Sequence, residues 1–524
     1  MTTHPPLHRT RSYGSPSGPQ LKPGSLSTGG AATRLILPWA LLVASGVATF
    51  GATSAIDLSE TILWGAIGLS LYLASLFAFL FARRRYLGLF EGQLGAWSLA
   101  YAILAFGIAT ATITQPQIGA SAIVDKEMIP SALVLLAISF TTWSIGYGVG
   151  RARIIQAPFR WGRAAIVSGL SSNVRRPGIL IAIFATSVAA DVLKTYLTGQ
   201  YGYVGDSSLV TVETAAWYTQ PLFIVSGLKF VALFGLSARV FVNRLDSFAR
   251  YLLPAFTFAV AMGLLTGMKE AFVTIVISVG VPYLLGHSRG RLFAIAGAVL
   301  VFVFVVTPTV NGFRQDIRGS SGTLDVASAL SLGVGKIFSP DGYLSSAGNA
   351  PTQGSTLERV RLIDNLALIM DKTPDRIPYR SIGEVVSAPI TGFVPRLLWP
   401  DKPVRLSGYE FYKLYYEGPS QSSSAITLQG SLYLYGGAWV LFVGMFLVGI
   451  ALRALDESLD VQNGLHGALF LVLIFSIVVK QEMDVASFLA TLATLIVSWI
   501  LGVHLVFRRV GVTERPNALF GQKA

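Results

Sequence analysis

Long apolar runs constrain the fold of this chain more than any other feature. A helix needs about 20 mostly apolar residues to cross the hydrocarbon core of a bilayer. The sequence therefore predicts an all-α polytopic membrane protein with about 12 transmembrane helices. The predicted spans lie near residues 35–56, 61–82, 94–114, 129–150, 177–197, 217–240, 251–267, 271–286, 292–309, 434–455, 465–481 and 485–507.

The composition agrees with a membrane protein and excludes several other classes. Only 13% of the 524 residues are charged, against about 25% in soluble proteins. The mean hydropathy is +0.60. The chain contains no cysteine, which excludes disulfide frameworks, thiol nucleophiles and cysteine-ligated metals.

The charges predict the orientation of the spans. Placing both termini in the cytoplasm puts 23 of the 40 basic residues on the inner side, with only 6 of the 27 acidic residues. Cytoplasmic loops carry such an excess of Lys and Arg. The net charge of +13 is therefore interpreted as a topology signal and not as a nucleic-acid-binding surface.

The same orientation divides the chain into five parts. Residues 1–33 form a cytoplasmic tail rich in Pro, Ser and Gly, which we expect to be disordered. Nine helices follow in 34–309, and three more in 433–507 before a second tail, 508–524. Between them, 310–432 forms one long extracytoplasmic loop with 12 basic and 11 acidic residues. Loops of this length usually carry function, so we expect the chemistry there.

An amphipathic helix is predicted early in this loop. Ser355-Thr-Leu-Glu358 has the form of a capping box, and apolar residues then recur every three or four positions as far as Met370. One interpretation is a helix on the membrane surface with a solvated polar face. The other is that Arg359 or Arg361 points into a ligand cleft.

The string Val394-Pro-Arg-Leu-Leu-Trp-Pro-Asp-Lys-Pro403 follows. Its three prolines forbid a regular helix or a central strand and hold Arg396 and Lys402 on a stiff frame. Two such cations suit an oxyanion such as a diphosphate. The alternative is a rigid loop in which Trp399 anchors at the interface and Arg396 pairs with Asp401. We interpret most of the tyrosines in 409–416 as part of an interfacial aromatic belt.

Charged residues within or beside the predicted spans are also candidates. Lys229 lies in mid-span, where a charge normally faces a partner or a wet cavity. It either lines a substrate cavity or pairs with Asp191 for structural reasons. Lys194 and Lys480 are expected to extend to the interface.

The Pro-Arg, Trp-Pro and Lys-Pro dipeptides of 395–403 resemble an element of bacterial O-antigen and oligosaccharide repeat-unit polymerases of the Wzy type. Supporting similarities are the small-residue turn before Lys269, Arg359-x-Arg361-x-x-Asp364, and Tyr433-x-Tyr435-Gly436. The resemblance implies a GT-C-like membrane glycosyltransferase of the bacterial cytoplasmic membrane. Such enzymes join oligosaccharide repeat units linked to undecaprenyl diphosphate on its outer face, with a flippase and a chain-length regulator as possible partners.

The resemblance assigns roles to residues of the loop. A lipid diphosphate leaving group needs cations, and a carboxylate would deprotonate the acceptor hydroxyl. Asp401 and Glu410 are further candidates for that base beside Asp364. No metal or cofactor is expected. The predicted catalytic residues are Arg396, Lys402, Arg361 and Asp364, and the predicted substrate-binding residues are Arg314, Arg318, Arg359, Lys269, Trp399, Glu410 and Tyr433.

Two alternatives are kept. Related O-antigen ligases share the topology but are expected to use a histidine in the outer loop, and none of the five histidines lies there. A transporter or flippase of polyprenyl-linked glycans would show internal repeats around a midplane site. No repeat is visible in the sequence.

Overall fold

The computed structural model describes the residues 31–84, 89–109, 127–198, 217–243, 245, 249–266, 269–286, 297, 301, 306, 310, 362–400, 402, 407–416, 426–459, 464–480 and 482–509. Eight of the helices in this part of the chain are long and apolar enough to cross a membrane. The chain is therefore an α-helical polytopic membrane protein. The eight are α1 (Ala31–Ser54), α2 (Leu58–Arg84), α3 (Leu89–Ala109), α5 (Met128–Val149), α7 (Pro177–Thr198), α9 (Thr219–Phe241), α20 (Gly437–Leu459) and α22 (Val485–Val506).

Three shorter apolar helices coincide with further predicted spans. They are α10 (Ala249–Thr266), α11 (Lys269–Gly286) and α21 (Leu465–Val479). The predicted span at 292–309 falls almost wholly outside the described residues. The total of twelve spans therefore stays a prediction.

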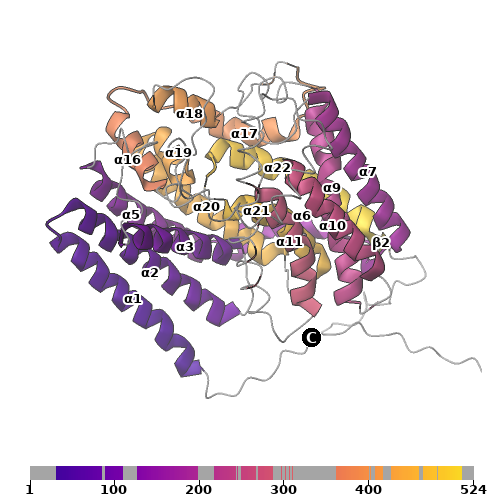
Figure 1. Cartoon of the computed structure of the whole chain (residues 1–524), viewed down its shortest axis with the longest axis horizontal. Helices are drawn as coiled ribbons and strands as arrows, with labels where there is room; N and C mark the ends of the chain where they lie inside the picture. Colours follow the sequence, from indigo (N-terminus) through magenta and orange to yellow (C-terminus); the bar gives the residue numbers. More distant parts are fainter. Residues whose placement is uncertain are drawn as a thin grey trace, which may run out of the picture.

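The C-terminal helices α20, α21 and α22 pack against helices from both the first and the middle part of the chain. α20 packs on α5, α21 packs on α3 and α11, and α22 packs on α9. Figure 1 shows α1, α2, α3 and α5 on one side of these helices, and α7, α9 and α10 on the other. One continuous apolar core includes residues of all of these helices except α1.

Close backbone contact joins α5 to α20. A Cβ atom at Gly146 would lie 2.0 Å from the carbonyl oxygen of Phe446, and one at Gly449 would lie 2.2 Å from that of Trp143. Small residues at such crossings let membrane helices approach closely. Only glycine fits these two positions without a shift of the helices.

A small sheet departs from the all-α prediction. Strand β1 (Leu170–Val174) pairs antiparallel with β2 (Phe507–Arg509), which directly follows α22. Arg175 strengthens the junction by donating from Nε to the carbonyl of Phe507 (3.1 Å) and from Nη2 to that of His504 (3.0 Å). Backbone N–H and C=O groups outside a helix need hydrogen-bond partners. The β1–β2 pairing supplies such partners to the segment that leaves α22 and the segment that enters α7.

The remaining helices are short. α6 (Arg153–Val167) lies between α5 and α7, and was not predicted as a helix. The predicted loop contains α16 (Leu362–Lys372), α17 (Gly383–Phe393) and α18 (Ser407–Tyr415), and α19 (Leu428–Leu434) leads into α20. Figure 1 shows α16, α18 and α19 together along one edge of the molecule.

The two ends of α22 define two sides of the molecule. Its start, at Asp484, contacts α19 through Ser431, and its end continues into β2 beside β1. A helix of 22 residues is about 33 Å long, enough to cross a bilayer. We call the end near α17 and α19 the loop side and the end near β1 and β2 the basic side.

The predicted amphipathic helix is corrected in part. The predicted capping box at 355–358 lies outside the described residues, and α16 is described from Leu362. Within α16 the polar face is not solvated, because Asp364 and Asn365 are both buried. α16 packs on α5, α18 and α19, so that neighbours cover more than its apolar stripe.

Two of the charged residues singled out within or beside spans have carboxylate partners. The Lys229 ammonium on α9 contacts the Asp191 carboxylate on α7, and both side chains are largely buried. This favours the structural interpretation of Lys229. Lys480, predicted to extend to the interface, lies 3.1 Å from the carboxylate of Glu270 at the start of α11.

Candidate functional site

The proline-rich loop after α17 folds back on itself around Arg396. The guanidinium donates from Nη1 to the carbonyl oxygen of Pro400 at 3.2 Å and to that of Lys402. Arg396 is only 8% exposed. Burial lowers the pKa of this guanidinium, and the carbonyl dipoles around it support its charge. Arg396 is thus part of the frame of the loop. Asp401, its proposed partner, lies outside the described residues.

Lys402 connects the same loop to α9. Its Nζ donates to the carbonyl of Val394 at 3.0 Å and to Oε1 of Gln220 at 3.1 Å. Gln220 in turn donates from Nε2 to the carbonyl of Gly392 at 2.6 Å. Arg396 and Lys402 therefore share one small region, as the stiff frame predicted, and Gln220 at the start of α9 positions it.

Helix α17 carries this loop along α22. A Cβ atom at Gly392 would lie 2.2 Å from the carbonyl oxygen of Ala490, and Thr494 Oγ1 donates to the carbonyl of Gly392 at 3.1 Å. The approach is so close that the end of α17 is fixed beside the first half of α22. Arg396 and Lys402 follow directly from that fixed end.

The face of α17 turned away from α22 is apolar and exposed. Ile382, Val386, Ile390 and Phe393 follow one another at spacings of four, four and three, which places them on one side of a helix. Leu397 and Leu398 extend this surface into the loop, and the predicted anchor Trp399 is 36% exposed. We call these seven residues the α17 stripe. It ends beside the two cations.

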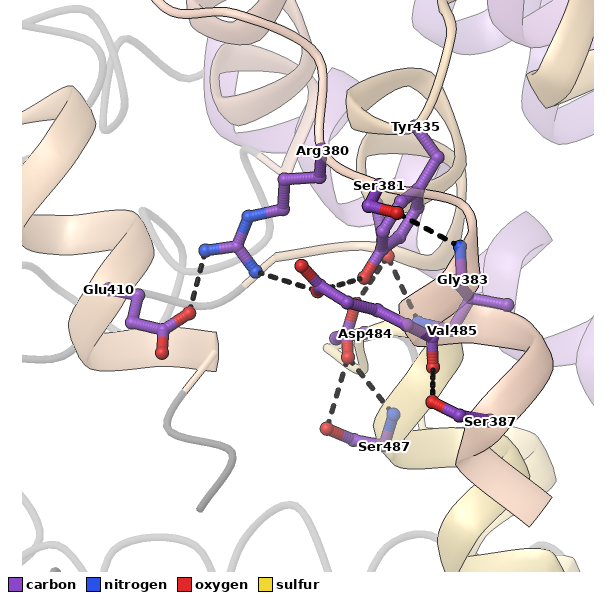
Figure 2. A network of polar contacts seen from close by, with 11 residues as sticks. Arg380, Ser381, Gly383, Ser387, Glu410, Tyr435, Asp484, Val485 and Ser487 are labelled. Atoms are coloured by element: carbon purple, nitrogen blue, oxygen red, sulfur yellow. Dashed lines mark hydrogen bonds and ion pairs between the residues drawn. The ribbon is translucent and has the colours of Figure 1, made fainter. Parts of the chain in front are cut away.

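A second polar cluster lies at the other end of α17. Figure 2 shows Arg380 reaching toward Glu410, and the distance from Arg380 Nη2 to Glu410 Oε2 is 2.7 Å. Arg380 also lies 4.0 Å from the carboxylate of Glu384, which accepts from the hydroxyl of Tyr435 at 3.3 Å. Burial alone lowers the pKa of Arg380, but the hydrogen bond and charge of Glu410 outweigh it, and the net shift is upward.

Asp484 joins this cluster to the start of α22. Its carboxylate accepts from Ser431 Oγ at 2.6 Å and from the backbone N–H of Ser487 at 3.0 Å, which caps the helix. Figure 2 shows Asp484 and Ser487 below Tyr435. Burial raises the pKa of the Tyr435 phenol, and the charges of Asp484 and Glu384 raise it further. The predicted residue Tyr433 lies two positions earlier in α19, and burial raises its pKa as well.

The two clusters are separated by the length of α17. A helix of 11 residues is about 16 Å long, so Arg380 and Arg396 lie near opposite ends of one rod. The structure thus brings the predicted residues Arg396, Lys402 and Trp399 together. Glu410 lies at the far end of α17, among groups that were not predicted.

Asp364 belongs to a third region. It is 2% exposed in α16, and its neighbour Asn365 accepts from the hydroxyl of Tyr416 at 2.6 Å. Lys372, at the end of the same helix, donates from Nζ to the carbonyl of Tyr415 at 2.8 Å. The contacts hold α16 to the C-terminal end of α18, where two tyrosines of the predicted aromatic belt turn inward.

Five predicted site residues cannot be placed by their side chains. Lys269 begins α11, but its side chain is outside the described part of the chain. The other four, Arg314, Arg318, Arg359 and Arg361, lie in undescribed segments. Among the described residues no group of three or more His, Asp or Glu side chains could hold a metal ion.

Sequence reasoning missed Arg380, Glu384, Gln220 and Asp484 as parts of these clusters. Asp484 had a usable signal, because Asp directly before an apolar run is typical of a helix N-cap. Glu384 lies four residues after Arg380, a spacing at which ion pairs can form, whereas the α18 partner of Arg380 and the partner of Gln220 are 30 and 182 residues away in the chain.

Comparison with known proteins gives a family but no named relative. No curated protein and no solved structure matches the sequence. One family model does, over residues 158–508, which is more than half of the chain. The match runs from within α6 to β2 and includes every predicted site residue. The chain therefore belongs to the family described as Domain of unknown function (DUF8712).

Proposed function

We propose that this protein is a membrane glycosyltransferase that polymerises oligosaccharide repeat units linked to undecaprenyl diphosphate. The polymer would be a surface polysaccharide, made at the outer face of the bacterial cytoplasmic membrane. The observation that carries the proposal is the pairing of two cations, Arg396 and Lys402, with the exposed apolar α17 stripe. A lipid diphosphate has the same two parts, an anionic head and a long apolar chain.

The cations suit the diphosphate. A guanidinium and an ammonium bind oxyanions through charge-assisted hydrogen bonds. The frame around them is preorganised by carbonyl groups of Pro400 and Val394 and by Gln220. Donors that are fixed before the reaction stabilise the charge that develops on a leaving group.

The α17 stripe suits the polyprenyl chain. Exposed apolar surface of this extent in a membrane protein is covered by lipid or by an apolar ligand. An isoprenoid lying along Ile390 and Leu397 would bring its diphosphate to the end of α17. The chain would then remain in the hydrocarbon layer while the head group meets Arg396 and Lys402.

The second cluster suits the glycan. Glu410, Arg380 and Glu384 offer charged hydrogen-bonding groups at the loop side, where Glu410 and Glu384 are about half exposed. Carboxylate and guanidinium groups bind sugar hydroxyls through charge-assisted hydrogen bonds. About 16 Å separates this cluster from the cations, which is compatible with a chain of several sugars.

The proposal is tested with purified full-length protein in proteoliposomes that contain a polyprenyl-diphosphate-linked oligosaccharide. We expect a ladder of longer glycans. Lys402→Met should lower the rate by about 10²-fold, the usual effect of removing one group that stabilises a developing anion. Arg396→Lys, which keeps the charge but loses the fork geometry, should also slow the reaction.

Matched variants separate binding from folding. Arg376→Gln removes an exposed cation of the same segment and should leave the rate unchanged. Gln220→Leu removes a partner of Lys402 but no charge, so a loss much smaller than that of Lys402→Met is expected. Wild-type glycan lengths in both Lys402→Met and Arg396→Lys would refute the role of the cations. Translocation without new glycosidic bonds would identify a transporter, and transfer to a different acceptor a ligase.

A further inference from the structure

Helix α6 is amphipathic, and two of its large apolar side chains are turned away from the protein. At 100° per residue, its polar side contains Arg153, Gln156, Arg160 and Arg163, and the opposite side contains Ile154 and Trp161. Gln156 is buried, whereas Ile154 is 82% exposed and Trp161 is 77% exposed. Gln156 thus faces the protein, whereas Ile154 and Trp161 face away from it.

The polar side of α6 is held by the end of α20. The amide of Gln156 contacts the carboxylate of Glu457 and donates to the carbonyl of Gly150 at 3.3 Å. Arg160 contacts Gln156 and lies 3.9 Å from Glu457, which also pairs with Arg453. This network fixes the rotation of α6 about its own axis, so the exposure of Trp161 is not accidental.

The position of α6 identifies what covers its apolar side. It lies between α5, which ends at Val149, and α7, which begins at Pro177, and both are long enough to cross a membrane. At 15 residues, or about 22 Å, α6 is too short and too basic to cross as well. A helix tied to two neighbouring span ends lies at the level where the hydrocarbon layer meets the head groups.

We propose that α6 is an in-plane interfacial helix that inserts Ile154 and Trp161 into the lipid leaflet on the basic side and binds anionic head groups with its neighbouring arginines. Tryptophan is enriched at this level of membranes. Helices with one apolar and one basic face bind there, more strongly when the lipids are anionic. Arg151, Arg153 and Arg176 are exposed at or beside α6, and Arg508 and Arg509 are exposed on β2 at the same end.

The absence of cysteine allows a direct test with full-length protein. Trp161→Cys and Ile154→Cys place a fluorophore on the apolar side, and Ala164→Cys places it on the exposed edge nearer Arg153 and Arg160. In phosphatidylcholine vesicles containing nitroxide-labelled lipid, labels at 161 and 154 should be quenched by the lipid nitroxide. Aqueous iodide should not quench these two labels. The label at 164 should be quenched by iodide and not by the lipid nitroxide. Two positions on the apolar side keep the test valid when one variant does not fold.

The head-group preference is tested in the same vesicles. Nitroxide-labelled phosphatidylglycerol should quench the label at 154 more than equally abundant labelled phosphatidylcholine, because each arginine near the surface enriches anionic lipid by up to about fivefold. Arg151→Gln with Arg153→Gln should remove most of that difference. Equal quenching by both lipids would overturn the anionic preference. Free access of iodide to positions 154 and 161, or protection from iodide without lipid quenching, would overturn the insertion itself.

Discussion

The charged residues that lie within or beside the helical spans are best understood one at a time. Lys229 and Asp191 come from different helices and meet as an ion pair, which is one of the two interpretations that the sequence left open for Lys229. A charge left alone inside a membrane protein is costly, so a pair of this kind usually fixes how two helices pack. α7 and α9 pack directly on each other, and this pair is one contact that sets their register.

Lys229→Met should therefore destabilise the protein, because it leaves Asp191 without its main cation in a largely buried position. Removing one partner of a buried pair costs on the order of 3 kcal/mol. A thermal unfolding curve in detergent measures the loss. The double variant Lys229→Met with Asp191→Leu should recover much of it, and the exposed Lys413→Met serves as a neutral control. A double variant as unstable as the single one would show that the pair does not act as a unit.

The candidate site also shows which contacts a local residue pattern can predict. The three prolines around Arg396 and Lys402 predicted a stiff loop that holds both cations, because proline restricts the backbone locally. The pairing of Arg380 with Glu410 and of Lys402 with Gln220 could not be predicted, since these contacts depend on how α9, α17 and α18 pack. Local restrictions can be read from the sequence, whereas these two long-range pairings depend on the tertiary packing.

Helices and strands likewise differ in how well the sequence predicts them. The eight described helices that are long enough to cross a membrane were predicted within a few residues, because a run of apolar residues is itself the reason that a helix crosses a bilayer. Helix α6 was missed because its four polar residues interrupt the apolar pattern, and β1 was missed because its partner β2 lies more than 330 residues later. Both elements lie on the basic side, where the sequence was interpreted only through its charges.

The crossing of α5 and α20 gives a prediction at the level of elements. Gly146→Ala places a Cβ atom 2.0 Å from the Phe446 carbonyl oxygen, so the two helices must move apart. Overpacking of this kind costs about 1–3 kcal/mol, and the apparent melting temperature should fall. Gly148→Ala is the matched control, because a Cβ atom there has no neighbour within 4 Å in the described structure. Equal melting temperatures for the two variants would refute the close crossing.

For the whole molecule, the main inference from composition is the orientation in the membrane. The basic side carries exposed arginines on β2 and around α6, and the loop side carries the mixed charges around α17 and α18. Because α22 connects the two sides, one orientation places Arg396 and Lys402 toward the outer face and the arginines of β2 in the cytoplasm. The excess of basic residues on one side favours that orientation, and the proposed chemistry on an outer-face substrate requires it.

Single cysteines test this orientation without a background, because the chain has none of its own. Lys413→Cys on α18 and Ser172→Cys on β1 are both exposed, and lie on the loop side and the basic side. A membrane-impermeant maleimide added to intact cells, after permeabilisation of any outer membrane, should label position 413 and spare position 172. Both should react once the cytoplasmic membrane is opened, which shows that position 172 is protected by the membrane and not by the fold. Labelling of position 172 alone in intact cells would reverse the orientation and place the two cations on the cytoplasmic side, where an outer-face substrate could not reach them.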